Sequence, residues 1–306
     1  MAGHMTPSRR DQQRALWLST IAFTLCFAVW TIFSIIGLSI RDDLGLSEFE
    51  YGLLIATPVL SGSLTRLILG VWTERYGGRL VFSIQMILTG MATFALTWAD
   101  SYASFLLAAF GVGLAGGSFI IGVAYVSKWY PQARQGTALG VFGMGNVGAA
   151  VTKFLAPFVM IAWGWEGVAE VWAAGIAIMG VAFYLLAKDD PDFAARREKG
   201  VAAPSLAEQF APLKNLQVWR FSLYYFFVFG GFVALALWLP HYLVQVYQVD
   251  VRTAGMAAAA FSLSASVFRA YGGVLSDRFG ARSVMYWTLG SRWCSCSCCP
   301  IRRPNM

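Results

Sequence analysis

Residues 56–79 read ATPVLSGSLTRLILGVWTERYGGR, an apolar helical stretch that carries one arginine and ends in a charged turn containing glycines. Residues 261–282, FSLSASVFRAYGGVLSDRFGAR, repeat this plan, with Arg66 and Arg269 at equivalent places. The offset between them is 269 − 66 = 203, and the two charged turns follow at the same offset. A constant offset of this kind indicates an internal duplication. The sequence therefore predicts two copies of one helical unit.

The composition is that of an integral membrane protein. Of the 306 residues, 58% are hydrophobic and only 13% are charged, and the mean hydropathy is +0.59. Such a chain has too little polar surface to cover a soluble globule of its size. The net charge of +7 does not indicate a nucleic-acid partner, because the Lys and Arg residues fall in loops on one side of the predicted spans. The lipid bilayer is the expected surrounding.

Hydropathy predicts eight membrane spans and an interrupted ninth that begins at residue 283. Three parts follow from this pattern: a six-span bundle at 1–187, a cytoplasmic connector at 188–218 with a short surface helix at 206–210, and an incomplete second bundle at 219–306. The predicted spans are 15–40, 52–72, 80–98, 102–127, 136–161, 168–187, 219–247 and 251–276.

Basic residues predict the orientation, because short loops rich in Lys and Arg stay in the cytoplasm. With the N-terminus inside, fifteen basic residues fall in inner segments, against Arg41 and Arg252 outside. We therefore expect a multi-pass protein of the bacterial inner membrane with a cytoplasmic N-terminus.

The two charged turns carry a recognisable motif. Residues 273–282 follow G-x-x-x-D-R-x-G-x-R, which resembles the cytoplasmic loop motif of the major facilitator superfamily, and residues 70–79 depart from it by having Glu for Asp. Six spans, a connector and a second set that starts with the same motif also match the parallel repeats of that superfamily. The resemblance implies an all-α major facilitator fold, in which a carboxylate at a helix end latches neighbouring helices in one conformation. The conformational residues predicted in this way are Gly70, Glu74, Arg75, Gly273, Asp277 and Arg278.

The last sixteen residues, SRWCSCSCCPIRRPNM, break the ninth span. Four closely spaced cysteines there could bind a soft metal, since thiolates at short spacing hold zinc or copper. The abrupt change of composition inside an apolar helix favours a truncated or out-of-frame end instead. With Cys26 inside the first span, we expect no structural disulfide, no metal site and no cofactor.

Two buried arginines point to an anionic substrate. A guanidinium is planar and permanently charged, and its paired donors match planar oxyanions such as nitrate, nitrite or a carboxylate. A charge near the centre of a span costs roughly 2.5–3.5 kcal/mol, which argues against chance placement. The alternative is that both arginines form structural ion pairs, although no acidic partner lies deep in the predicted spans. Small residues flank both at helical spacing and leave room for an ion: Gly62, Ser63 and Gly70 for Arg66, and Ala265, Ser266, Gly272 and Gly273 for Arg269.

The fifth predicted span is rich in glycine and contains Asn146, an amide that must find a partner in the membrane. The run GMGNVG at 143–148 resembles the nitrate signature of the nitrate/nitrite porter family, and so do FAVW at 27–30, AGGSF at 115–119 and WYP at 129–131. The resemblance implies that nitrate or nitrite binds between the two arginines. The substrate-binding residues implied by the motifs are Arg66, Arg269, Asn146, Tyr225, Phe229, Phe33, Phe119, Gly143 and Gly145.

The sequence therefore predicts a secondary active transporter of nitrate or nitrite that works by alternating access, with proton-coupled nitrate uptake preferred. It is not expected to be an enzyme. The alternatives are a nitrate/nitrite antiporter, a porter for small organic carboxylates and a truncated product that does not transport. Lys153 is expected to extend its amine to the outer membrane interface, with a role in coupling as the alternative, and His241 is expected at that interface too.

Overall fold

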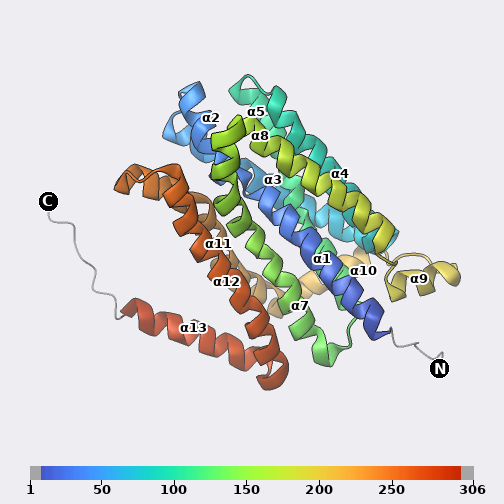
Figure 1. Ribbon diagram of the computed structural model, residues 1–306. Coiled ribbons are helices and arrows are strands. Elements are labelled where there is room, and N and C mark those ends of the chain that lie inside the picture. Colours follow the sequence, from blue (N-terminus) through green and yellow to red (C-terminus); the bar gives the residue numbers. More distant parts are fainter. Residues whose placement is uncertain (1–7, 298–306) are drawn as a thin grey trace.

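The structure, a computed structural model, describes residues 8–297 and the side chains of residues 8–290 (Figure 1). Within this part of the chain all regular structure is helical. The α-helices are α1 (Arg9–Trp30), α2 (Ile36–Leu44), α3 (Glu48–Tyr76), α4 (Gly78–Phe94), α5 (Tyr102–Val112), α6 (Ser118–Ser127), α7 (Gln135–Gly143), α8 (Gly148–Leu186), α9 (Pro191–Glu198), α10 (Leu206–Phe210), α11 (Leu216–Tyr247), α12 (Val251–Phe279) and α13 (Ala281–Ser297). Short 3₁₀ segments join several of them: η1 (Ile32–Ser34), η2 (Ala95–Trp98), η3 (Gly113–Gly117), η4 (Gln132–Arg134), η5 (Met144–Val147) and η6 (Ala211–Lys214).

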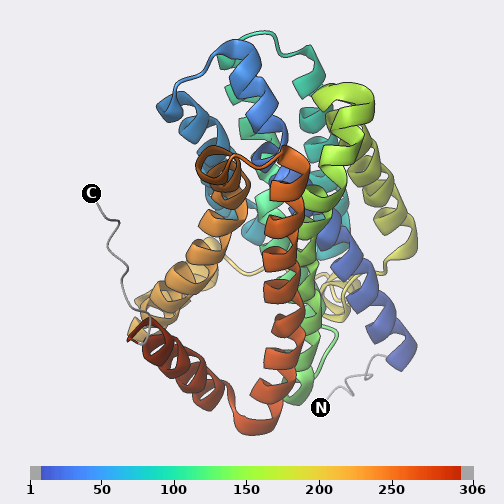
Figure 2. The same ribbon diagram turned by 60° about the vertical axis from the view of Figure 1, so that its left-hand side comes forward.

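Seven helical segments among the described residues are long and apolar enough to cross a membrane, and the all-α membrane fold is confirmed. One of them, Gln132–Leu186, contains both the fifth and the sixth predicted spans. Its backbone leaves the helical conformation at Trp163 and at Gly164, where φ is +72°. Glycine adopts this conformation without the steric penalty of a Cβ. Figures 1 and 2 show α8 turning back on itself, so one continuous segment makes two antiparallel passes.

The duplication is confirmed in the backbone. Helices α3 and α12 have 29 residues each and begin at residues 48 and 251, an offset of 251 − 48 = 203. Both end at a glycine in nearly the same conformation, with φ of +85° at Gly77 and +84° at Gly280. Ser47 and Asp250 cap the two helices, each accepting a hydrogen bond from a backbone N–H of the first turn.

Helices α1 to α8 form a compact bundle, and α11 and α12 lie against it (Figures 1 and 2). The chain reaches α11 through α9, α10 and η6, so the predicted surface helix at 206–210 is confirmed as α10. Helix α13 extends away from the bundle beyond the end of α12 (Figure 2).

Glycines bring α7 and α8 into backbone contact with α12. A Cβ added to Gly140 would lie 2.9 Å from the carbonyl oxygen of Arg269, and Gly273 packs on Gly136. Further along, a Cβ on Gly255 would lie 2.5 Å from the carbonyl oxygen of Lys153. Small residues allow helices to approach this closely in membrane proteins. The two halves of the repeat therefore meet along a line of glycines.

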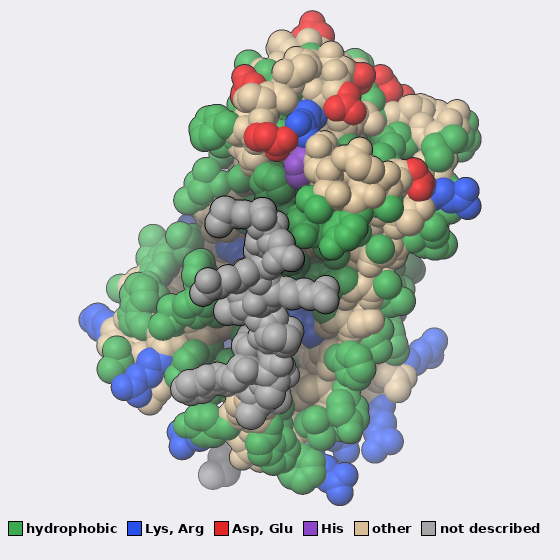
Figure 3. Space-filling model, turned by 90° about the vertical axis from the view of Figure 1, so that its left-hand side faces the viewer, with side chains coloured by type: hydrophobic (Ala, Val, Ile, Leu, Met, Phe, Trp, Pro, Cys, Tyr) green, Lys and Arg blue, Asp and Glu red, His purple; other side chains and the backbone are tan. Residues whose placement is uncertain are grey.

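The two ends of the molecule carry opposite charge. Figure 3 shows Asp and Glu side chains gathered at one end, Lys and Arg at the other, and hydrophobic side chains over the surface between. Helices α3 and α12 begin at the first end, near Glu48 and Asp250, and finish at the second, near Arg75 and Arg278. We call these the acidic end and the basic end.

Candidate functional site

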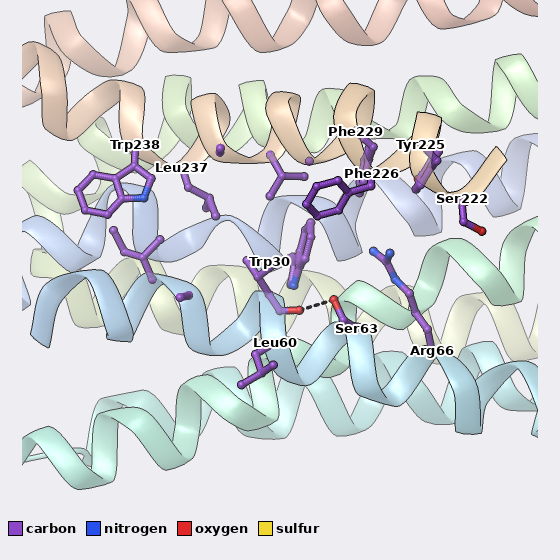
Figure 4. Close-up of a pocket in the computed structure, with 16 residues that line it drawn as sticks. Trp30, Leu60, Ser63, Arg66, Ser222, Tyr225, Phe226, Phe229, Leu237 and Trp238 are labelled. Atoms are coloured by element: carbon purple, nitrogen blue, oxygen red, sulfur yellow. Dashed lines mark hydrogen bonds between the residues drawn. The ribbon is translucent and has the colours of Figure 1, made fainter. Parts of the chain in front are cut away.

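A cavity of about 630 Å³ lies between α3 and α11 and reaches Trp30 at the end of α1 (Figure 4). Its walls are mostly aliphatic and aromatic. Among the described residues that line it, Arg66 alone carries a formal charge. A mostly apolar cavity with a single fixed cation in its wall is suited to an anion that sheds its water.

The Arg66 side chain is held by one backbone carbonyl and two rings. Its Nε donates a hydrogen bond to the carbonyl oxygen of Gly116 in η3 at 2.9 Å. Its guanidinium carbon lies 5.9 Å from the ring centroid of Trp30 and 5.8 Å from that of Phe229, within cation–π range. Trp30 is fixed in turn, because its indole N–H donates to the carbonyl oxygen of Pro58 at 2.9 Å. With Nε engaged, the two terminal nitrogens of Arg66 face the cavity (Figure 4).

Arg269 reaches the same ring from α12. Its guanidinium carbon lies 5.5 Å from the ring centroid of Phe229, and its Nη1 is 3.5 Å from the carbonyl oxygen of Gly143. A Cβ on Gly143 would touch this side chain, at 3.7 Å from its Cδ. The structure therefore brings together the two arginines that the sequence singled out. Neither forms an ion pair with any residue between 8 and 290, so the structural ion-pair interpretation is wrong there.

Three aromatic planes lie nearly parallel beside the arginines. Tyr225 and Phe229 stack with centroids 4.9 Å apart, and Phe119 stacks on both at 6.1 Å and 6.4 Å. The Tyr225 hydroxyl interacts with the guanidinium of Arg269. Flat rings next to planar cations favour a flat anion, because ring faces and guanidinium forks can contact it at once.

Asn146 lies in η5, close in sequence to the carbonyl that Arg269 approaches. It is 1% exposed, and its Oδ1 has no hydrogen-bond partner among the described residues. A buried amide without a partner costs roughly 1–3 kcal/mol. Within the described part of the glycine-rich span, the Asn146 amide oxygen is the buried side-chain polar atom that has no hydrogen-bond partner.

Of the predicted binding residues, Arg66, Tyr225 and Phe229 line the cavity. Arg269, Phe119 and Gly143 lie outside its lining but contact this group, and Asn146 lies in η5 next to Gly143. Phe33 and Gly145 face other parts of the bundle. Phe33 belongs to η1 and is buried in the core of the first bundle, outside the lining of the cavity. Gly145 faces α1, since a Cβ there would collide with the ring of Phe23. Sequence reasoning missed Trp30 as a site residue. The signal available was its place in the FAVW run, at the end of a span, with a polar N–H that must be satisfied.

The motif residues differ between the two copies. The Asp277 carboxylate accepts hydrogen bonds from the backbone N–H groups of Gly136 and Thr137, at 2.9 Å and 2.6 Å, and from the Thr137 hydroxyl at 2.6 Å. It therefore lies at the N-terminus of α7, where a helix favours negative charge. Gly273 gives the close approach described above, whereas Gly70 meets only the side chain of Ile120.

Glu74, the counterpart of Asp277, is bound within the first bundle and the connector. It forms ion pairs with Lys128 at 2.8 Å and with Arg196 of α9 at 3.5 Å. The guanidinium groups of Arg75 and Arg278 each lie over the next residue's ring, Tyr76 and Phe279. The expected contact of a carboxylate with a helix end is thus present for the second copy of the motif and absent for the first.

Lys153 is not at the membrane interface, so that prediction is wrong. Its side chain is 0% exposed, and Nζ donates to the carbonyl oxygen of Ala149 at 3.1 Å and to the hydroxyl of Ser262 at 3.2 Å. The reason is the position of Lys153 around the axis of α8: its side chain lies on the face of the helix that packs on α12, where it bonds Ser262, and does not extend toward the acidic end.

His241 lies near the acidic end, as expected, but its side chain is largely buried. It is 7% exposed, packs on Tyr51 at 4.8 Å and has Nε2 at 3.3 Å from a carboxylate oxygen of Glu48. Glu48 also pairs with Arg41 at 2.7 Å. These contacts join α11 to α2 and α3.

Comparison with known proteins identifies the relatives of the chain. Residues 18–303 match the family model of the Major Facilitator Superfamily. The chain is 44% identical over 296 residues to a Thermus thermophilus protein named "Probable nitrate/nitrite antiporter NarK1", covering 92% of this chain and 65% of that protein. It is 33% identical over 274 residues to the "Nitrite extrusion protein" of Bacillus subtilis, covering 90% of this chain and 68% of the relative. The chain thus spans about two thirds of the length of these relatives.

Solved structures show the same fold. A bacterial homolog of the human lysosomal transporter Spinster, in an inward-facing and unoccupied conformation, matches with a TM-score of 0.68 at 21% identity. The match covers 90% of this chain and 64% of that one. The four clustered cysteines of the tail lie beyond the residues whose side chains are described.

Proposed function

Because this chain belongs to the Major Facilitator Superfamily and to the nitrate/nitrite porters within it, we propose that it moves nitrate or nitrite across a membrane by alternating access. One observation carries the proposal: Arg66 and Arg269, from the two copies of the repeat, approach one ring, Phe229, and have no acidic partner among the described residues. Uncompensated cations in an apolar surrounding are costly, and an anion from solution offsets that cost.

The chemistry of the surroundings favours a planar oxyanion. Both guanidinium groups can offer paired N–H donors, and the stacked rings of Phe119, Tyr225 and Phe229 are flat. Asn146 adds a buried side-chain amide, whose NH₂ group is a donor of the kind that an oxyanion accepts from. A small organic carboxylate shares the planar head, but its tail would have to replace rings that already contact one another.

The membrane setting follows from the charge distribution. We place the protein in the bacterial inner membrane with the basic end and the N-terminus in the cytoplasm, because basic segments stay inside. The protein catalyses transport and no covalent reaction, so it is not an enzyme. Nitrate or nitrite, protons and the lipid bilayer are its partners.

Coupling to protons is the preferred mode, and exchange of nitrate for nitrite is the alternative. Two uncompensated cations, Arg66 in the cavity wall and Arg269 on the neighbouring ring of Phe229, would make the site costly to close without an anion, which favours exchange of one anion for another. A titratable group buried between the two halves of the repeat favours symport, and the amine of Lys153 lies there, bonded to Ser262 of α12.

Uptake by proteoliposomes tests the proposal. The reconstituted chain should accumulate nitrate, with nitrite competing and chloride and acetate not competing. Nitrate flux equal to that of protein-free vesicles would refute transport by this chain. Competition by acetate as strong as that by nitrite would favour the organic carboxylate porter.

A further inference from the structure

Lys153 is a fully buried amine in the contact between α8 and α12. Its Nζ has two hydrogen-bond acceptors, the carbonyl oxygen of Ala149 and the hydroxyl oxygen of Ser262. The Ser262 hydroxyl donates its own hydrogen to the carbonyl oxygen of Ala258 at 3.0 Å, so it faces Lys153 as an acceptor. A neutral amine has two N–H bonds and an ammonium has three. The surroundings satisfy the neutral amine and leave one hydrogen of the ammonium without an acceptor.

No carboxylate compensates a charge at Lys153, because its recorded partners among the described residues are a carbonyl and a hydroxyl. On α12 the charged residues nearest to Ser262 in sequence are Arg252 and Arg269, both cations. The remaining charged residues of the elements packed on α8 lie toward the ends of the molecule: Arg9, Arg10, Asp11 and Arg14 on α1, Arg41, Asp42 and Asp43 on α2, Arg79 on α4, Asp277 and Arg278 on α12, and Glu166 and Glu170 on α8 beyond its turn at Trp163. A buried ammonium without a partner is strongly unfavourable.

The enclosure of Lys153 depends on the contact between the two halves of the repeat. Gly255 of α12 packs on the Lys153 carbonyl and on Pro157, so no side chain of α12 separates the helices at this level. Seven residues separate Lys153 in α8 from Asn146 in the preceding η5, and seven residues, or about 10 Å of helix, separate Ser262 from Arg269 on α12. If α8 and α12 move apart, water reaches Nζ and the ammonium becomes the favoured form.

We propose that Lys153 carries the coupled proton of transport: it binds a proton while α8 and α12 are apart and releases it when they close. The inference rests on the proposed function. The step transfers one proton from water to the lone pair of Nζ and later returns it to water, and no other bond changes. One proton moving with one nitrate makes the cycle electroneutral.

Proteoliposomes with Lys153→Met test the proposal in two modes. In the first, an inward proton gradient drives nitrate accumulation without internal anion; in the second, internal nitrite exchanges for external nitrate without a gradient. We expect the variant to lose at least ~10-fold in the first mode and to stay within about threefold of the wild type in the second. Lys188→Met is the matched control, since Lys188 pairs with Asp11 at 2.9 Å on the surface, and it should keep both modes.

The outcomes separate the two proposals. Proton-driven accumulation by Lys153→Met at the wild-type level overturns the inference, and so does an equal loss of both modes. A wild-type protein that exchanges anions but ignores the proton gradient overturns the inference while leaving anion transport standing. A wild-type protein inactive in both modes refutes the proposed function.

A second measurement uses the wild-type protein, so it holds even if the variant does not fold. Nitrogen-15 NMR of lysine-labelled protein in nanodiscs, with Lys153→Arg used to assign the resonance, reports whether Nζ is an amine or an ammonium. We expect a neutral amine for Lys153 at pH 8. An ammonium signal for Lys153 at pH 8 would overturn the inference.

Discussion

Gly45 and Gln248 end equivalent helices in the same left-handed backbone conformation. The offset is 248 − 45 = 203, and φ is +61° at Gly45 and +53° at Gln248. In each case the residue's N–H caps its helix by bonding a carbonyl one turn back, that of Arg41 or Val244. Glycine takes this conformation freely, whereas it costs most other L-residues, glutamine included, roughly 1–2 kcal/mol. Both copies of the repeat keep the left-handed backbone at this position, but only the first copy has the glycine that adopts it without strain.

Gln248→Gly should therefore stabilise the protein by about 1 kcal/mol. The variant loses a hydrogen bond from the Gln248 amide to the Gln245 carbonyl at 2.7 Å, which is exposed and small in effect. Thermal unfolding in detergent should show a rise in Tm of a few degrees. Gln245→Gly, one turn earlier in right-handed helix, is the control and should lower Tm. A lower Tm for Gln248→Gly would contradict the strain argument.

Replacing either site arginine by lysine should abolish nitrate uptake. Lysine keeps the charge but loses the planar fork, so the donors left after a bond to the Gly116 carbonyl cannot match two oxygens of a flat anion as those of Arg66 can. Arg66→Lys and Arg269→Lys should each reduce uptake by at least ~10-fold in proteoliposomes. Arg252→Lys near the acidic end, where Arg252 lies over the ring of Phe158, serves as the control. Uptake retained within about twofold in both site variants would show that charge alone suffices.

Asn146→Ala should weaken nitrate binding by roughly 1–3 kcal/mol, the usual loss when a hydrogen bond to a charged group is removed. Because the amide oxygen has no partner within residues 8–290, the folded state should lose little stability. Titration calorimetry on the purified chain measures the affinity, and thermal unfolding provides the control. If affinity is unchanged and Tm falls, Asn146 serves helix packing instead of the anion.

Asp277→Asn should weaken the contact between α12 and the start of α7 at the basic end. The charged acceptor of two backbone N–H groups at the start of α7 would be replaced by a neutral amide. Bonds to a charged group contribute about 1.5–3 kcal/mol, so amide hydrogen exchange at Gly136 and Thr137 should speed up roughly tenfold or more. Glu74→Gln is the matched control and should leave exchange at these amides unchanged, since Glu74 bonds Lys128 and Arg196. Equal effects of the two substitutions would argue against a specific contact.

Asp190→Asn should reduce the pH dependence of stability. Burial raises the pKa of the Asp190 carboxyl, and Lys128 at 3.7 Å opposes this only in part. The folded state then binds the proton more tightly than the unfolded state, so this contribution is full at low pH and is lost as pH rises above about 4. Asparagine can still cap α9 at the Phe193 N–H. The Tm of the variant relative to the wild type should rise between pH 4 and pH 7, and a relative fall would mean that the ion pair with Lys128 dominates.

The features that the sequence predicted well depend on rare or periodic signals. Charged residues are scarce in the spans, so Arg66 and Arg269 stood out, and a fixed offset of 203 specified that both belong to equivalent helices. The long apolar runs gave the helices themselves. Tyr225 and Phe229 lie one turn apart on α11, and the motif that suggested them led to the rings beside the arginines.

The features that it missed depend on rotation about a helix axis. Lys153 was placed from its distance along the span, which says nothing about which neighbour it faces. Phe33 was misplaced because the chain leaves the α-helix at Thr31, whose hydroxyl bonds the Phe27 carbonyl at 3.0 Å, and the following 3₁₀ turn changes the direction of every later side chain. Gly145 faces α1 for the same reason, since η5 interrupts the helix at that point.

The line of glycines between α7 and α12 has a mechanical consequence. Gly136, Gly140 and Gly273 meet without interlocking side chains, so either helix can slide past the other without forcing a rotamer to change. Separating the two helices exposes backbone and little apolar side-chain area. The free-energy cost of breaking and re-forming the contact is therefore small. The side chains of α7 and α12 therefore resist sliding little along this contact. A polar interaction that holds the two helices together there is the hydrogen bond from the Thr137 N–H to the Asp277 carboxylate. A methyl group added at any of these glycines would hold α7 and α12 apart. We expect such a substitution to slow their relative movement even though the residues around the two arginines are unchanged.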